Sequence, residues 1–362
     1  AITWPQWTDS VLDGLEGQAT KFNANIKAIA VLRAIERKGR SPTPDERDAL
    51  LRFTGWGGIP ASFNLDGTDA AWKQRARQLS EMLQPGEYES ARASVNNSHY
   101  TEPFIVRWIW AALRRLGFEG GRILDPSSGI GHFLGCMPAD IATRSRITAV
   151  ELDDLAGRVL RALYASAGVD VRIQDLEAAT LADGSFDLVV SNVPFGNYQV
   201  SDGRNRPYSR FSIHNWFVGK ALDLVRPGGL VCLITSAWFL DQRDESARAH
   251  AASQAGLVGA VRLPQGAFMR LASTDVQSDI VMLRRRQPGE AAGVEWVDLD
   301  FVPDELRDPR CQDKYMQFNA WYAANPRNVL GLIDKVTRGY TPVPTAILDG
   351  DVVRTHLSKG LG

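Results

Sequence analysis

The tetrapeptide Asn192-Val193-Pro194-Phe195 combines three groups that could bind a flat ring bearing an amino group. The amide oxygen of Asn192 could accept one N–H of the amine, a neighbouring main-chain carbonyl could accept the other, and the ring of Phe195 offers a stacking face. An exocyclic amine is a weak nucleophile because its lone pair is delocalised into the ring. Two acceptors on its hydrogens would favour the reactive, pyramidal form. The same letters also suit a plain strand exit, in which Pro194 ends the strand and Gly196 turns the chain.

A glycine-bearing turn lies upstream of this tetrapeptide. Residues 122–124, which read Arg-Ile-Leu, predict a short strand, which is followed by Asp125-Pro126 and by Gly129 and Gly131. Glycines at such a turn let the backbone approach a ligand closely, because no Cβ intervenes. The alternative explanation for the Asp-Pro pair is a simple turn initiator.

Two acidic residues follow the next predicted strands. The strand at residues 147–150 ends in Glu151, where nucleotide-binding α/β folds keep the acid that accepts hydrogen bonds from ribose hydroxyls. The strand at residues 169–173 precedes Asp175, which could accept from an adenine amino group. Each acid could instead cap a helix after its strand. The ordered series of turn, acids and tetrapeptide indicates a cofactor site followed by a catalytic site.

This series resembles the motifs of S-adenosylmethionine-dependent amino-methyltransferases, and most closely those of the N6-adenine DNA methyltransferases. The similarity runs from about residue 96 to 286 and is carried by His99-Tyr100-Thr101-Glu102-Pro103, Asp125-Pro126-x-x-Gly129-x-Gly131, Glu151, Asp175 and Asn192-Val193-Pro194-Phe195. The segment Phe53-Thr54-Gly55-Trp56-Gly57-Gly58 is similar to methylase portions of large methylase–helicase proteins of phages and mobile elements. One position departs from the family, whose second tetrad residue is usually Pro where this chain has Val193. The backbone carbonyl remains, so we expect activity to be retained.

The resemblance implies a role for each matching residue. S-adenosylmethionine would be bound by residues at the turn and strand ends, namely Tyr100, Thr101, Asp125, Pro126, Gly129, Gly131, Phe133, Glu151, Leu152, Asp175, Leu176 and Asn192. The catalytic residues would be Asn192, Val193, Pro194 and Phe195, which would hold the target amine and stack on a base flipped out of the duplex.

Alternating strands and helices between residues 122 and 286 predict an α/β fold, a Rossmann-like methyltransferase sheet with helices on both faces. The last strand, residues 279–283, would pair antiparallel if the resemblance holds. We expect a helical N-terminal region at residues 1–95, a catalytic domain at 96–286, and a small C-terminal subdomain at 287–362 for target recognition or dimer contact.

Local signals place several helices. Residues 18–38 show helical apolar spacing that stops at Gly39, and Thr43-Pro44-Asp45-Glu46 is a capping box with Pro at the first helical position. Thr101 is expected to cap a helix that Gly117 closes.

Composition excludes several other functions. The 362 residues carry a net charge of −1, and the three cysteines are far apart and follow no proline, which argues against a zinc site and against cytosine-C5 methylation. We find no membrane-spanning run and no signal pattern, and expect a cytoplasmic protein. Double-stranded DNA, the expected partner, would need concentrated positive charge. The candidate DNA-binding residues are Arg204, Arg206 and Arg210, although a solvated loop is the alternative.

The sequence therefore predicts a site-specific adenine-N6 DNA methyltransferase, acting without a nuclease of its own. One alternative keeps the cofactor and changes the acceptor to cytosine N4, an RNA base or a protein glutamine. A second alternative, to which Val193 points, is a degenerate DNA-binding or anti-restriction module.

Overall fold

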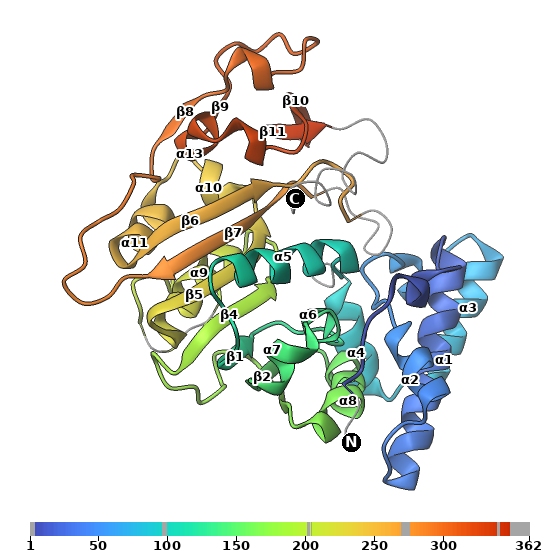
Figure 1. The fold of residues 1–362 in the computed structure, drawn as a ribbon. Helices are drawn as coiled ribbons and strands as arrows, with labels where there is room; N and C mark the ends of the chain where they lie inside the picture. Colours follow the sequence, from blue (N-terminus) through green and yellow to red (C-terminus); the bar gives the residue numbers. More distant parts are fainter. Residues whose placement is uncertain are drawn as a thin grey trace. The chain divides into compact units, whose positions relative to one another are not determined.

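The computed structural model describes residues 4–95, 100–200, 203, 205–268, 276–338 and 341–347. The chain forms two compact units (Figure 1). The first consists of Ala1–Thr180 with Phe268–Thr274, and the second of Leu181–Ala267 with Asp275–Gly362. Among the described helices, none is long and apolar enough to cross a membrane.

The strands of the first unit are all parallel, in the order β3-β2-β1. They are β1 (Arg122–Asp125), β2 (Arg146–Glu151) and β3 (Asp170–Ile173). Apart from Asp125, the buried positions of β1 and β2 carry Ile, Leu, Ala and Val, as expected for parallel strands covered by helices. The acid predicted to follow the second strand, Glu151, is the last residue of β2.

The main sheet strands of the second unit run in the order β4-β5-β7-β6. They are β4 (Phe186–Asn192), β5 (Val225–Ser236), β6 (Ala255–Arg262) and β7 (Ser278–Arg285). β4 is parallel to β5, whereas β7 is antiparallel to both β5 and β6, which confirms the antiparallel last strand. This mixture of parallel strands, one antiparallel strand and intervening helices is the predicted Rossmann-like methyltransferase fold.

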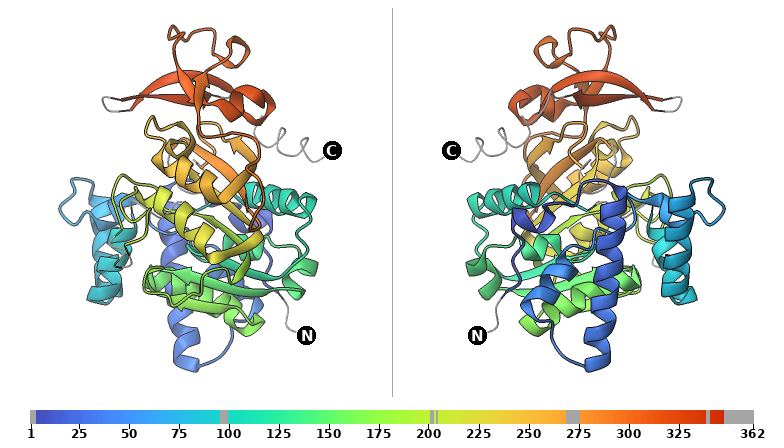
Figure 2. Two further views of the ribbon diagram at one scale, coloured as in Figure 1. Left: turned by 90° about the vertical axis from the view of Figure 1, so that its left-hand side faces the viewer. Right: turned by 90° about the vertical axis from the view of Figure 1, so that its right-hand side faces the viewer.

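Helices of the first unit include those predicted in the N-terminal region. They are α1 (Gln18–Lys38), α2 (Pro44–Leu51), α3 (Ala70–Met82), α4 (Pro85–Ser94), α5 (Pro103–Arg115), α6 (His132–Gly135), α7 (Ala139–Thr143) and α8 (Asp154–Tyr164), with 3-10 turns η1 (Asp9–Leu12), η2 (Pro60–Phe63) and η3 (Ala165–Ala167). The right-hand view of Figure 2 shows α1 along its length. It ends at Gly39, whose φ of +57° is left-handed, and the capping box of Thr43 and Glu46 begins α2 as predicted.

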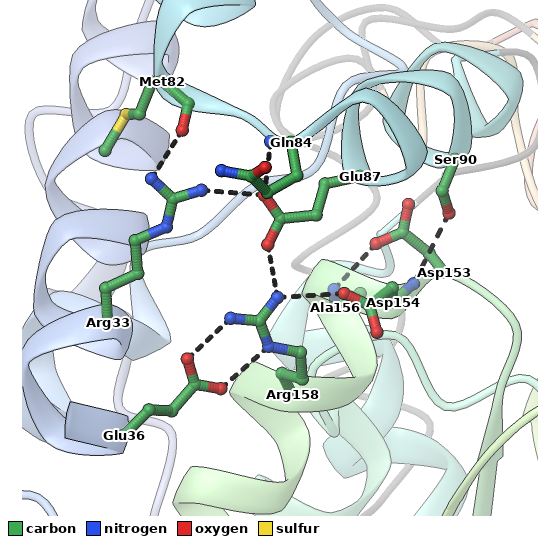
Figure 3. Close-up of polar contacts among 10 residues, drawn as sticks. All are labelled: Arg33, Glu36, Met82, Gln84, Glu87, Ser90, Asp153, Asp154, Ala156 and Arg158. Atoms are coloured by element: carbon green, nitrogen blue, oxygen red, sulfur yellow. Dashed lines mark hydrogen bonds and ion pairs between the residues drawn. The ribbon is translucent and has the colours of Figure 1, made fainter.

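A network of arginines and carboxylates ties the N-terminal helices to α8 (Figure 3). Arg158 of α8 contacts Glu36 of α1 at 2.6 Å and Glu87 of α4 at 2.5 Å, and Arg33 of α1 contacts Glu87 at 2.7 Å. The same α8 follows directly after Glu151. Ion pairs therefore join α1 and α4 to α8, the helix that follows the predicted cofactor acid Glu151.

The prediction that Thr101 caps a helix is wrong. Helix α5 begins at Pro103, and its N-cap is Glu102, whose side chain makes no capping hydrogen bond. Proline suits the first helical position and holds the residue before it in extended backbone, so the helix starts one residue later than predicted. Gly117, with a φ of +84°, follows the end of α5 as expected.

The second unit carries helices between its strands and a C-terminal segment beyond β7. Its helices are α9 (Ile213–Leu224), α10 (Trp238–Asp241), α11 (Ser246–Gln254) and α13 (Ala320–Ala324), with η4 (Asp304–Leu306) and η5 (Pro326–Asn328). The C-terminal segment adds two antiparallel pairs, β8 (Leu299–Phe301) with β9 (Gln317–Asn319) and β10 (Leu332–Arg338) with β11 (Thr341–Ile347). Figure 1 shows them beyond β6, at the top. The boundaries proposed from sequence at residues 95 and 286 stay predictions.

Candidate cofactor and catalytic sites

The glycine turn after β1 is fastened to the end of β2. The amide of Gly129 donates to Oε2 of Glu151 at 2.7 Å, and the amide of Ser128 donates to the carbonyl of Val150 at 3.0 Å. Gly129 and Gly131 have φ values of +54° and +92°, a left-handed backbone that favours glycine. Two predicted cofactor residues, Gly129 and Glu151, are thus brought into direct contact.

The alternative hypothesis for Glu151, that it caps the helix after its strand, is wrong. Its Oε1 accepts from the amide of Asp153 at 2.8 Å, while the cap of α8 is Asp153 itself, which accepts from Ala156 at 2.7 Å. Each carboxylate oxygen of Glu151 uses one backbone donor and keeps further acceptor capacity. Burial, assisted by the charge of Asp153, raises the pKa of Glu151 to about 7.

The aromatic residues around the turn are buried. A Cβ on Gly129 would lie 2.5 Å from Cε1 of Tyr100, so the phenol ring packs directly on the turn. Burial raises the pKa of Tyr100 well above its ordinary value, with Glu151 and Asp153 contributing, so the phenol stays protonated. Phe133 is buried, and its carbonyl accepts from the indole N–H of Trp110 at 2.9 Å.

The other predicted cofactor residues of the first unit lie around this turn and at the ends of β2 and β3, whereas Asn192 ends β4 in the second unit. Asp125 and Pro126 are buried at the end of β1, and Thr101 is buried with its carbonyl 3.1 Å from Nδ1 of His132. Leu152 is 66% exposed, directly after Glu151.

The acid after β3 also lies beside the end of β2. The amide of Gln174, next to Asp175, donates to the carbonyl of Glu151 at 2.9 Å. Asp175 is exposed and Leu176 is buried.

One residue at the turn was not singled out from the sequence. His132 is buried between the rings of Trp7, at 4.0 Å, and Tyr100, at 4.8 Å between centroids. Burial lowers the pKa of His132 to about 3, so the imidazole is neutral, and its role is to pack against Trp7 and Tyr100 next to the turn. Only its place directly after Gly131 could have signalled this role.

These residues fit S-adenosylmethionine. The carboxylate of Glu151 has acceptor capacity for ribose hydroxyls, and exposed Leu152 offers an apolar surface beside the acid. The expectation that the glycines leave room for a ligand is not met on their Cβ side, because Tyr100 packs against Gly129 and Tyr164 packs against Gly131. A bound S-adenosylmethionine supplies an activated methyl group. The parallel strands and this turn form the Rossmann-like fold that the sequence predicted.

The tetrapeptide predicted to be catalytic lies in the second unit at the carboxyl end of β4. Asn192, the last residue of β4, is in register with Ile234 of β5, and the amide of Val193 donates to the carbonyl of Ile234 at 3.1 Å. Pro194 has no amide hydrogen to continue this ladder, so the strand ends there. Val193 and Phe195 are buried, and Asn192 and Pro194 are half-buried.

The chain after the tetrapeptide is held by packing. A Cβ on Gly196 would lie 2.5 Å from Cε1 of Tyr198, so this glycine permits the close approach of that ring. His214 is buried, and burial lowers its pKa to about 4 although it hydrogen-bonds the backbone of Gly196. His214 is therefore neutral at pH 7 and supports the loop.

Of the three arginines predicted to contact DNA, Arg206 makes ion pairs within its own unit. Its guanidinium lies 2.8 Å from Asp183 and 3.1 Å from Asp223. Arg210 is exposed, and Arg204 lies outside the described residues. Contact with DNA by these arginines stays a prediction.

A family model described as Eco57I restriction-modification methylase matches residues 152–258. These residues include β4, the tetrapeptide and β5. The match confirms the predicted likeness to methyltransferases of restriction-modification systems, and with it S-adenosylmethionine as the cofactor.

Individual proteins show the same relationship at low identity. Defense against restriction protein B of Escherichia phage P1 is 27% identical over 283 residues, which cover 78% of this chain and 11% of that protein. The tRNA1(Val) (adenine(37)-N6)-methyltransferase of Serratia proteamaculans is 30% identical over 135 residues, which cover 34% of this chain and 50% of that protein. The solved methyltransferase subunit of a type I restriction-modification system from Streptococcus thermophilus is 12% identical with a TM-score of 0.46, covering 76% of this chain and 68% of that one. The chain thus spans from about a tenth to half of the two curated relatives.

The raised pKa of Glu151 predicts a pH dependence of cofactor binding. A protonated carboxyl loses acceptor capacity, so affinity for S-adenosylmethionine should rise as the pH increases through about 7. Isothermal titration calorimetry between pH 6 and 8.5 measures this. The Glu151→Gln variant should bind more weakly and show a flat profile, and a wild-type affinity that falls over this range would contradict the role of Glu151.

The same pKa predicts that the stability of the fold depends on pH. Because the pKa of folded Glu151 lies above its value in an unfolded chain, its contribution favours the folded state below about pH 4.5 and is lost as the pH rises to about 7.

Proposed function

We propose that this chain transfers a methyl group from S-adenosylmethionine to N6 of adenine in double-stranded DNA. The observation that carries the proposal is the tetrapeptide from Asn192 to Phe195 at the carboxyl end of a parallel strand, within the segment that matches restriction-modification methylases. In open α/β sheets, ligands bind at the carboxyl ends of the strands. Asp125 and Glu151 each end a strand of the first unit, and Asn192 ends a strand of the second unit.

In this proposal the tetrapeptide holds the target amine. The amide oxygen of Asn192 accepts one N–H, and the carbonyl of Val193 or Pro194 accepts the other, which draws electron density onto the nitrogen. Phe195 stacks on the base, which must leave the duplex to be reached. The carbonyl is a backbone group, so Val193 in place of the usual proline keeps the acceptor. The lone pair of the amine nitrogen would form the bond to the methyl carbon as the bond from that carbon to the cofactor sulfur breaks, leaving S-adenosylhomocysteine, and the methylated amine would release one proton to solvent.

The cofactor is held in this proposal by the first unit. Glu151 accepts from the ribose hydroxyls, the backbone of the turn at residues 129–131 contacts the cofactor, and Asp175 with Leu176 contacts the adenine. Support comes from the hydrogen bond between Gly129 and Glu151, which places the acid at the turn.

The test is a methylation assay with defined acceptors. The purified chain is incubated with deuterium-labelled S-adenosylmethionine and, separately, unmethylated duplex DNA, transfer RNA or a glutamine-containing protein, and products are analysed by mass spectrometry. We expect labelled N6-methyladenine from duplex DNA. Labelled N4-methylcytosine, or label only in RNA or protein, would overturn the proposed acceptor.

A second candidate is suggested by the phage P1 relative, whose name is defense against restriction protein B. Methylation of DNA could protect it from a nuclease, so this role is compatible with the same chemistry. A non-catalytic form of this candidate predicts cofactor binding without product in the assay above.

A further inference from the structure

We propose that the loop at residues 54–59 of the N-terminal region is part of the cofactor site, with Asn25 and Gly55 as positioning residues. These two residues hold Tyr100 against the glycine turn. The ring in turn fixes the position of the turn relative to Glu151, which is the arrangement that binds the cofactor. The inference rests on the proposed use of S-adenosylmethionine and does not depend on which acceptor is methylated.

Tyr100 is clamped between two glycines from distant parts of the chain. A Cβ on Gly129 would lie 2.5 Å from Cε1 of Tyr100, and a Cβ on Gly55 would lie 2.8 Å from Cε2 on the other edge of the ring. Real Cβ atoms do not approach so closely, so any side chain at Gly55 must push the ring toward Gly129. Tyr100 is only 8% exposed, which leaves the ring little freedom to move elsewhere.

Asn25 fixes the loop on the other side. It lies on α1 and is fully buried, its Nδ2 donates to the carbonyl of Gly55 at 2.6 Å, and its Oδ1 accepts from the amide of Thr54 at 2.8 Å. The hydroxyl of Thr54 also donates to this oxygen, at 3.2 Å. Three hydrogen bonds from one buried side chain therefore set the position of Gly55.

Further contacts link the turn held by Tyr100 to Glu151, the predicted cofactor acid. The amide of Gly129 donates to Glu151, and α8, which follows Glu151, is tied to α1 through Arg158 and Glu36 (Figure 3). Helix α1 thus contacts the loop at Thr54 and Gly55 through Asn25, and it contacts α8 through Glu36. A displacement of Tyr100 would move the amide of Gly129 relative to the carboxylate that it binds.

A matched pair of glycine substitutions separates positioning from backbone strain. Gly55 has a φ of +65° and Gly39 a φ of +57°, but a Cβ on Gly39 meets nothing within 4 Å. Both Gly55→Ala and Gly39→Ala place alanine in left-handed backbone and should lose stability from this strain, and Gly55→Ala should lose more because its Cβ also meets Tyr100. Only Gly55→Ala should weaken binding of S-adenosylmethionine, by about tenfold or more in Kd, whereas Gly39→Ala should stay within about twofold of wild type.

A kinetic measurement distinguishes positioning from general damage. Gly55→Ala should raise KM for S-adenosylmethionine while kcat at saturating cofactor changes little. If Gly55→Ala does not fold by circular dichroism, Asn25→Asp replaces the donor to the Gly55 carbonyl by an acceptor and should also raise Kd. Folded Gly55→Ala or Asn25→Asp that binds S-adenosylmethionine as tightly as wild type would overturn the inference.

The outcomes also separate this inference from the proposed function. If the wild-type chain binds S-adenosylmethionine but yields no methylated DNA, the proposed acceptor is wrong. The role of the loop at residues 54–59 is then decided by the binding data for the variants. A folded wild-type chain that binds no S-adenosylmethionine would overturn the cofactor and the inference together.

Discussion

Replacing Asn192 with alanine is expected to lower the rate of methyl transfer by about 10²–10³-fold, the range for losing one preorganised hydrogen bond that acts in the transition state. The amide oxygen would no longer accept from the amine, and the amine would keep its delocalised lone pair. Affinity for S-adenosylmethionine should stay within a few-fold, because Glu151 and the glycine turn are untouched. Single-turnover kinetics together with calorimetry measure the two quantities separately.

Asn197 provides the control for this experiment. It lies shortly after the tetrapeptide and is exposed, so Asn197→Ala should transfer methyl groups at close to the wild-type rate. A folded Asn192→Ala variant with wild-type activity would show that Asn192 does not hold the amine. Equal losses in both variants would point to the loop as a whole.

The Arg262→Ala substitution is expected to destabilise the second unit by about 3–5 kcal/mol. Arg262 is fully buried at the end of β6, where it binds both oxygens of Asp279 at 2.9 Å and one oxygen of Asp241 at 2.6 Å. Its guanidinium also lies 4.7 Å from the ring centroid of Tyr322. Alanine would leave two buried carboxylates without their cation. Denaturant unfolding, with fluorescence as the signal, measures the loss.

The pH dependence of this variant and a surface control sharpen the test. Burial raises the pKa of Asp279 even with Arg262 present, and without Arg262 it would rise further. A carboxyl whose pKa is raised in the folded state favours that state at low pH. The difference in unfolding free energy between wild type and Arg262→Ala should therefore shrink as the pH falls toward 5. The Arg284→Ala substitution should lower the free energy of unfolding by at most about 1 kcal/mol, because Arg284 pairs with Glu290 at the surface. A similar loss for both arginines would contradict the special role of Arg262.

The sequence predicted the central strands and the order of the motif residues because these are local signals. Parallel strands buried by helices are continuous apolar runs, and turn glycines and capping boxes depend on residues that are close in the chain. The same reasoning failed at Thr101, where Pro103 set the start of α5. It also left two roles open for Glu151, because whether an acid after a strand caps a helix or binds a turn depends on its neighbours in space.

What only the tertiary structure decided is which distant groups meet. The contact of Glu151 with Gly129, the clamp of Tyr100 between Gly55 and Gly129, and the burial of Arg262 against Asp241 and Asp279 join residues far apart in the chain. A residue's type and its neighbours in sequence state what it can bind. Folding selects the partner, because burial raises the cost of every unpaired polar group and so requires particular side chains to come together.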